Sequence, residues 1–301
     1  MNKKILVLIT IIIAIILFVV VAGLIFYYLL YYEKPEEEVD LEDEGDFSII
    51  KAEPMPYEED YRFNIGTAEF VIYVPDLEAF EFGYFEAYNN GEKVYSTTPL
   101  YMIMDLLAFE YNGNKYIIIS EYSGGAHCCF EEYIFLLDKN NDLELIGILD
   151  LGNTHILEDS LFMEDDDLYI KIFDDRFAYF YTPYVNSYFF IQYLKIEQDN
   201  LIASNNNFQE DYLKEAIRCE DNLKEQLEQE IEEFESYSPL LVCITVNYLL
   251  AGQEQKAWQE FEQYSVQVPL EHYGTSVNLE DFKQGLIELY QSESIPIYRL
   301  R

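Results

Sequence analysis

The feature that most constrains this chain is an uncharged stretch of 28 residues near its start, Ile5 to Tyr32. As a helix rising about 1.5 Å per residue it would be ~42 Å long, more than the ~30 Å hydrocarbon core of a bilayer. Four of its last six residues are tyrosines, whose amphipathic rings favour the headgroup region. The stretch therefore predicts one transmembrane helix that anchors the chain in a membrane.

The flanking charges orient this helix. Lys3 and Lys4 lie in the tail formed by residues 1–4, and acidic residues follow the apolar stretch. The positive-inside bias places the N-terminus in the cytoplasm and everything after Tyr32 outside it. A cleaved signal peptide ending near Ala22 is the alternative, but its apolar core would be longer than the usual ~7–15 residues.

The charge composition limits the classes of partner that the chain can bind. Lysine and arginine number 18 against 57 aspartates and glutamates, a formal charge of −39. Nucleic acid is a poor partner for such a chain, because affinity for it comes from neutralising phosphates with basic side chains. The excess of acid favours solubility by self-repulsion, with attraction to a cationic partner or a divalent metal as the alternative.

The rest of the chain divides into three segments and predicts an α+β fold class. Residues 33–60 begin with the acidic run EKPEEEVDLEDEGD and predict an extended linker. Residues 61–204 hold alternating runs rich in Tyr, Phe and Ile, which predict a mainly antiparallel β domain, either a sandwich or packed sheets. Residues 205–301 change to helical spacing and predict a small α-helical domain.

Turn signals separate the runs of the β domain. Asn-Gly pairs at 90–91 and 112–113 indicate hairpins, as do the polar stretches 139–142 and 198–200. A further turn is expected at Asp174–Asp175, and the acidic run 164–167 is interpreted as a solvated turn. The aromatic stretch 176–190 is expected to belong mainly to the core, with a stacking surface for glycan or peptide as the alternative.

The C-terminal segment predicts helices over about 209–236, 239–251, 254–264 and a stretch after Asn278. The apolar stripe of the first comprises Leu213, Ile217, Leu227, Ile231 and Phe234. A straight hairpin turning near 236–238 would place Cys243 opposite about residue 231, ~18 Å from Cys219 along the helix. That is beyond disulfide reach, so the two cysteines can bridge only if the first helix breaks near Asn222, and Cys243 is expected to be simply buried.

The second and third of these helices resemble part of a tetratricopeptide repeat. Tyr248, Gly252, Ala257 and Phe261 have the spacing of that repeat's tyrosine, glycine, alanine and phenylalanine, over about 30 residues. The resemblance implies a repeat-like hairpin within the helical domain. Such hairpins offer grooves of the kind that accept a segment of a protein partner.

The densest chemistry lies in EYSGGAHCCF, residues 121–130. Its core, SGGAHCC from Ser123 to Cys129, resembles a motif of exported bacterial proteins of unassigned function, where it sits within a β-rich domain. The resemblance implies export and fold type, and it carries no catalytic role. Together with the anchor, it indicates the cytoplasmic (inner) membrane of a bacterium.

The candidate ligand-binding residues of this motif are Gly124, Gly125, His127, Cys128 and Cys129. The glycines can adopt positive φ and break the strand. In an extended chain His127 and Cys129 share one face, while Cys128 points to the other. The structural interpretation makes Cys128 and Cys129 a vicinal disulfide or a pair of small buried residues.

Three chemical alternatives remain open for the motif. His127, Cys128 and Cys129 are candidate ligands for zinc or copper. His127 could instead lower the pKa of a neighbouring cysteine and support thiol chemistry. A ligand pocket in which His127 donates a hydrogen bond is the third.

Weaker signals complete the inventory. Asp138, Asn140, Asp142 and Glu144 alternate as calcium ligands do, although Leu143 occupies the position of the required glycine. The sequence holds no Walker loop, dinucleotide fingerprint, nucleophile elbow or His-Glu-x-x-His motif. This favours a binding protein over an enzyme, with no cofactor expected and a metal left open.

These patterns predict a single-pass, membrane-anchored envelope protein whose ectodomain binds a protein or another envelope ligand. The membrane is contacted through Ile5–Tyr32, and the helical domain is expected to hold the protein partner. The alternative is an extracytoplasmic metal-binding or thiol-redox protein that uses His127, Cys128 and Cys129.

Overall fold

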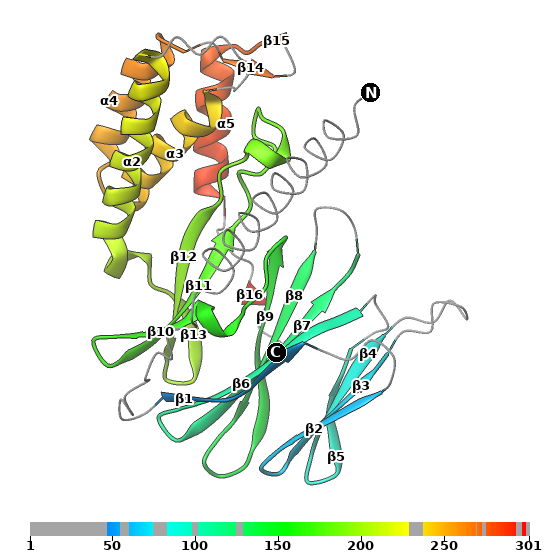
Figure 1. Ribbon diagram of the computed structural model, residues 1–301. Coiled ribbons are helices and arrows are strands. Elements are labelled where there is room, and N and C mark those ends of the chain that lie inside the picture. Colours follow the sequence, from blue (N-terminus) through cyan, green and yellow to red (C-terminus); the bar gives the residue numbers. More distant parts are fainter. Residues whose placement is uncertain are drawn as a thin grey trace, which may run out of the picture. The chain divides into compact units, whose positions relative to one another are not determined.

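Short antiparallel strands followed by helices make up the fold (Figure 1). The computed structural model describes residues 47–54, 60–74, 83–97, 102–124, 129–228, 237–268, 270–272, 275–292 and 297–298. The predicted anchor, residues 5–32, lies outside them. None of the helices in these ranges is both long and apolar enough to cross a bilayer.

A six-stranded sheet, here called sheet A, occupies the middle of the fold in the order β1-β6-β7-β8-β9-β16. Its strands are β1 (Phe47–Pro54), β6 (Met102–Tyr111), β7 (Asn114–Tyr122), β8 (Phe130–Leu137), β9 (Leu143–Gly152) and β16 (Ile297–Tyr298). β7 and β8 are buried on both faces: Ile117 and Ile119 contribute to one core, Tyr116 and Ile118 to another. A sheet covered on both sides explains why these strands are almost continuously apolar.

The two outer strands correct the predicted domain boundaries. Residues 47–54 were expected in the acidic linker, yet they form β1 and pair with β6. Phe47 and Ile49 pack on the core beneath β6, so the apolar alternation of this segment outweighs its acidic surroundings. Near the other end of the chain, β16 lies within the predicted helical domain but pairs with β9.

Two smaller sheets cover the faces of sheet A. Sheet B comprises β2 (Tyr61–Ile65), β3 (Ala68–Tyr73), β4 (Tyr84–Asn89) and β5 (Glu92–Ser96). Phe70 and Phe85 of sheet B meet Phe135 of sheet A edge to face. Sheet C comprises β10 (Leu161–Glu164), β11 (Asp167–Asp174), β12 (Phe190–Glu197) and β13 (Asn200–Ala203), and it packs on the other face. The predicted packed antiparallel sheets are thus confirmed.

The helices pack on the outer face of sheet C. They are α2 (Gln209–Glu228), α3 (Ser238–Leu250), α4 (Glu254–Ser265) and α5 (Leu279–Gln291), with the small hairpin β14 (Glu271–His272) and β15 (Thr275–Ser276) between the last two. Short 3-10 turns lie at Glu158–Ser160, Tyr184–Asn186 and Asn205–Phe208. Tyr193 of β12 stacks on Phe208 and contacts Tyr212 of α2. Helical and β segments therefore share cores rather than forming separate domains.

Two helix ends lie where the sequence predicts them, whereas the buried stripe of the first helix differs from the prediction. Asn278 caps α5 by accepting hydrogen bonds from the amides of Glu280 and Asp281. Gly252, at φ +72°, ends α3. In α2 the buried stripe is Tyr212, Ala216, Cys219 and Leu223, whereas Ile217 is 45 % exposed and does not belong to it. Ile231 and Phe234 lie outside the described residues.

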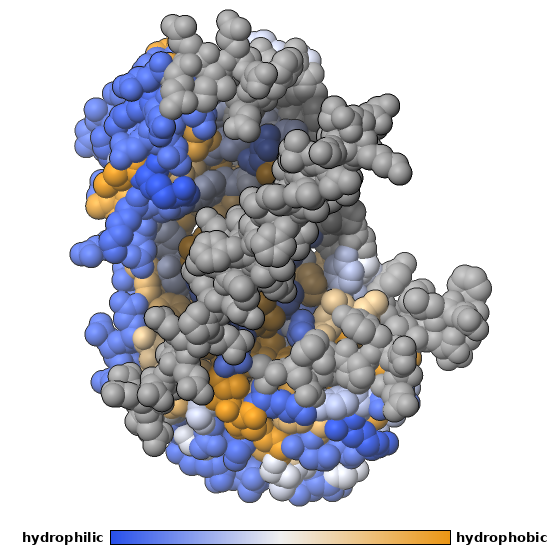
Figure 2. Space-filling view, in the orientation of Figure 1, coloured by the Kyte–Doolittle hydropathy of each residue, from blue (hydrophilic) through white to orange (hydrophobic). Residues whose placement is uncertain are grey.

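The turns of the β part are mostly where the sequence predicts them. Left-handed residues occur at Asn90, Asn112, Asn141 and Gln198, and the acidic run 164–167 is a hairpin turn. The turn expected at Asp174–Asp175 is wrong, because β11 ends at Asp174 and a long loop leads to β12 at Phe190. Within that loop Phe177 is buried, whereas Tyr179 is 47 % exposed, so its aromatic residues divide between core and surface. Figure 2 shows hydrophilic residues over much of the outer side of the helices.

Candidate functional site

The SGGAHCC motif connects β7 to β8 at one end of sheet A, here called the motif end. Gly124 has φ +84°, as expected for a residue that breaks the strand. The Ser123 amide donates to the Cys129 carbonyl over 3.0 Å and closes the strand pair. Gly125, His127 and Cys128 lie outside the described residues, so their predicted roles stay predictions. Among the motif's predicted site residues, only Gly124 and Cys129 can be placed.

Cys129 is half-buried and disulfide-bonded. The chain has four cysteines, and Cys219 and Cys243 are bonded to each other. The vicinal disulfide stays a prediction, but a disulfide-bonded Cys129 offers no thiolate to a metal.

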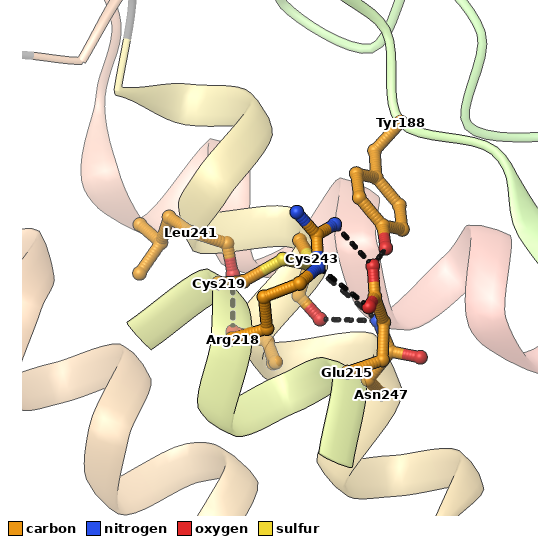
Figure 3. Close-up of a disulfide and its surroundings, with 8 residues drawn as sticks. Tyr188, Glu215, Arg218, Cys219, Leu241, Cys243 and Asn247 are labelled. Carbon is orange, nitrogen blue, oxygen red and sulfur yellow. Dashed lines mark hydrogen bonds and ion pairs between the residues drawn. A yellow bond between two sulfur atoms is a disulfide. The ribbon is translucent and has the colours of Figure 1, made fainter. Parts of the chain in front are cut away.

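Cys219 and Cys243 form a disulfide that the sequence analysis rejected (Figure 3). Their Cα atoms are 6.2 Å apart. The prediction was wrong because it assumed a straight hairpin that turns near 236–238 and separates the two cysteines by ~18 Å along the helix. In the structure Cys219 of α2 and Cys243 of α3 lie side by side.

The same pair belongs to the one group of three potential metal ligands found among the described residues, Glu215, Cys219 and Cys243. The sulfurs are bonded to each other, so neither is a thiolate. The Glu215 carboxylate already accepts hydrogen bonds from Arg218 and from the Tyr188 hydroxyl (Figure 3). In its oxidised form this cluster is a structural crosslink beside an ion pair.

On the face of sheet A that packs against sheet C, ionisable groups gather at the motif end. His155 Nε2 lies 3.2 Å from Asp105 Oδ2, and the imidazole ring lies 4.7 Å from the Phe130 ring. Burial raises the pKa of Asp105, and His155 partly opposes that rise. His155 has no spacing in the sequence that links it to the motif, yet the fold places it beside the residue that follows Cys129.

Glu132 lies fully buried on this same face. Its carboxyl accepts from Ser120 Oγ at 2.6 Å and from the Ile156 amide at 3.0 Å. Burial raises its pKa to about 8, against the opposing effect of these two donors. The Ser120 hydroxyl donates its proton to Glu132. It is therefore not positioned as a nucleophile that His155 would activate.

On the opposite face of sheet A, Glu121 and Glu131 lie directly across from each other on β7 and β8. Glu121 is 1 % exposed, and neither of its oxygens has a hydrogen-bond partner among the described residues. The Tyr133 hydroxyl donates to Glu131 over 2.8 Å. Burial raises the pKa of Glu121 to about 7, the Tyr133 hydroxyl opposes this rise, and the neighbouring Glu131 adds to it. We call Glu121, Glu131, Tyr95 and Tyr133 the Glu121 cluster.

The sequence carries a signal for this cluster in the acids that lie inside apolar strands. Glu121, Glu131 and Glu132 interrupt strands that are otherwise apolar, on both sides of the motif. An acid inside a strand that is buried on both faces must be buried as well, and buried acids concentrate at functional sites. Only the pairing of strands shows which of these acids share a face.

The calcium candidates lie at the other end of sheet A, in the turn between β8 and β9. Asp138 accepts from the amides of Asn140 and Asp142, each over 2.8 Å. These backbone donors, that of Asp142 first, lower the pKa of Asp138. Among the described residues Asp138, Asp142 and Glu144 do not converge as metal ligands do. The four-residue pattern is a local turn motif.

Comparison with known proteins gives limited support. No family model and no solved structure matches the chain. A probable thylakoid lumen protein of Synechocystis sp. is 26 % identical to it over 153 residues. That similarity covers 49 % of this chain and 43 % of the relative, so the chain matches less than half of that protein's length.

Proposed function

We propose that this protein is a membrane-tethered extracytoplasmic binding protein. The uncharged stretch 5–32 and the acidic run after it support a tether. The Cys219–Cys243 disulfide supports an oxidising compartment. The relative's name points the same way, because a lumen lies across a membrane from the cytoplasm. The cytoplasmic membrane of a bacterium is the proposed location.

The motif end of sheet A is the proposed ligand site. The observation that carries this proposal is Glu121, a fully buried carboxyl with no partner in the described structure. Leaving such a group unpaired costs stability, and strained or costly groups are kept where a ligand uses them. Asp105, Glu132 and His155 surround the same strand ends.

The helices are proposed to contact a protein partner. A groove of about 250 Å³ is lined by residues of α3, α4 and α5, among them Trp258, Ile287 and Tyr290. Val266, just after α4, is 77 % exposed. Apolar side chains in a groove between helices suit an apolar segment of another protein.

Photocrosslinking in intact cells tests the ligand site. A benzoylphenylalanine in place of the partly exposed Tyr95, whose side chain lies on the cluster's face of β5, should give a discrete adduct. The same residue at Lys139, in the turn at the opposite end of sheet A, serves as the matched control and should not. Adducts of equal yield at both positions, or none at position 95, would contradict the proposed site.

Thiol-redox activity is the second candidate, and the half-buried, disulfide-bonded Cys129 favours it over metal binding. A Cys128→Ser variant distinguishes the two functions. If the pair exchanges with substrate thiols, the remaining Cys129 should trap a mixed disulfide that reductant releases. The binding proposal predicts no such adduct beyond that of a variant lacking both cysteines.

A further inference from the structure

We propose that the Glu121 cluster binds an organic cation, the ammonium or guanidinium group that a lysine or arginine side chain carries. The inference rests on the proposed function and names the chemistry of its ligand. The carboxyls of Glu121 and Glu131 supply the negative charge, and the rings of Tyr95 and Tyr133 supply the walls.

The first step is the contrast between Glu121 and other buried acids of the chain. Glu132 accepts from Ser120 and Ile156, and Asp174 accepts from Arg176 at 2.5 Å. Glu121 is as buried as these two, but neither of its oxygens has a partner at hydrogen-bond distance and angle among the described residues. The Tyr133 hydroxyl lies near enough to lower the pKa of Glu121, yet it donates to Glu131. A like charge directly opposite, on Glu131, makes the ionised pair unfavourable without a counter-charge.

The second step is that the chain builds the same set of groups twice with its own lysine. Glu86 accepts from the hydroxyls of Tyr73 and Tyr88 and from Lys93, whose ammonium lies 5.8 Å from the Tyr88 ring centroid. This assembly comprises a carboxylate, two tyrosines and a lysine.

The second assembly is in the helices. Glu220 accepts from Tyr248 and Tyr264, each over 2.9 Å, and pairs with Lys224 at 2.8 Å. The Glu121 cluster has the carboxyls and the two tyrosines, but no lysine or arginine pairs with it in the described part of the chain.

The third step is access and shape. The rings of Tyr95 and Tyr133 have centroids 5.9 Å apart. Tyr95 and Glu131 are partly exposed, so the cluster reaches the surface on their side while Glu121 lies beneath. A ligand reaches Glu121 when one of these two side chains turns aside. Aromatic faces attract cations, and the attraction is larger where water is excluded.

A metal ion fits the cluster less well. Calcium takes 6–8 oxygen ligands, and the described residues here supply two carboxyls and a phenol already bonded to Glu131. No third acid, histidine or cysteine completes a ligand set at this place among the described residues. An organic cation needs only one carboxylate and an aromatic wall.

Titration calorimetry on the full chain in zwitterionic detergent at pH 7.5 tests the inference. The probe is N-acetyl-lysine methylamide, and its neutral counterpart is N-acetyl-norleucine methylamide. The lysine compound should bind at least tenfold more tightly than the norleucine compound. Glu121→Gln should weaken its binding at least tenfold, whereas Glu144→Gln, which removes an equal charge from the exposed side of β9, should leave it unchanged.

Several results would overturn the inference. These are equal affinity for the two compounds, no binding of either, or undiminished binding by Glu121→Gln. Saturable calcium binding that Glu121→Gln removes would assign the cluster to a metal instead. An adduct in cells at position 95 that persists in Glu121→Gln, without lysine binding, would reject the cation while leaving the proposed ligand site intact. A melting temperature of the variant that is no lower than that of the wild type shows that lost binding is not lost folding.

Discussion

At the scale of single residues, buried glutamates on the two faces of sheet A have raised pKa values but different hydrogen-bond partners. Burial raises the pKa of Glu132 to about 8 against two hydrogen-bond donors, and it raises the pKa of Glu121 to about 7 against the Tyr133 hydroxyl alone. Both values exceed the ordinary glutamate pKa because water is excluded from the strand ends. Which acids are buried could be predicted from their positions in apolar strands. Which of them have hydrogen-bond donors could not be predicted. The donors of Glu132 are Ser120, brought close by the pairing of β7 with β8, and Ile156, from the loop after β9.

Stability should therefore fall as pH rises past the ordinary glutamate range. The unfolded chain releases the Glu121 proton near pH 4.5, whereas the folded chain holds it to about pH 7, so the folded state binds more protons in that window. Glu121→Gln should match the wild type near pH 4.5 and exceed its unfolding free energy by roughly 3 kcal/mol at pH 8. Urea titrations across pH check this. Parallel curves for the two proteins would show that Glu121 titrates normally.

At the scale of elements, local signals predicted more than long-range ones. Asn-Gly pairs, the Asn278 cap and Gly252 act within a few residues, and each lies where the sequence predicts. The failures involve distance along the chain. The acidic composition of 33–60 masked the apolar alternation of β1, and the Cys219–Cys243 disulfide joins residues 24 apart on two helices.

Loss of the Cys219–Cys243 disulfide should destabilise the helices. The bond joins residues 24 apart, and closing a loop of that length removes about 3 kcal/mol of conformational entropy from the unfolded chain. The double variant Cys219→Ser/Cys243→Ser should lose about that much in chemical denaturation. Reduction of the wild type should produce the same loss. A loss well below 1 kcal/mol would mean that α2 and α3 are held by packing alone.

At the scale of the whole molecule, the β and helical parts are joined by buried charge. Asp174 at the end of β11 is 1 % exposed and pairs with Arg176 at 2.5 Å. Arg176 also donates to the Leu289 carbonyl at the end of α5, over 2.9 Å, and to that of Ser292. One side chain thus neutralises an acid of sheet C and satisfies carbonyls left free where α5 ends.

Arg176→Ala should cost about 3–5 kcal/mol, because it leaves the Asp174 carboxylate buried with no counter-charge and only the neutral donors of the residue-176 backbone amide and Gln192. Arg218→Ala is the matched control, since its ion pair with Glu215 is largely exposed and should contribute less than about 1 kcal/mol. Hydrogen exchange should also show faster opening of α5 in Arg176→Ala. Equal losses of unfolding free energy in the two variants would contradict the role given to Arg176 in joining sheet C to α5.

The shared cores make a second prediction at this scale. Phe177 and Phe190 belong to the helical core, and Tyr212 of α2 bonds the Ile191 carbonyl of β12. A chain ending at Ser204 would expose this surface of sheet C. It should therefore be degraded by protease at concentrations that leave the full chain intact, contrary to the separate helical domain expected from the sequence. A protease-resistant fragment 47–204 would restore the two-domain interpretation.

The most direct test of the ligand site is a pH titration of Glu121 itself, monitored by NMR through the ¹³C shift of its side-chain carboxyl. The signal is assigned by its absence from the Glu121→Gln spectrum. Without ligand, the full chain should give an apparent pKa of about 7. Saturation with N-acetyl-lysine methylamide should lower that pKa by at least one unit, because a nearby cation favours the carboxylate. A pKa that the compound leaves unchanged, or one already near the ordinary glutamate value, would contradict a cation site built around Glu121.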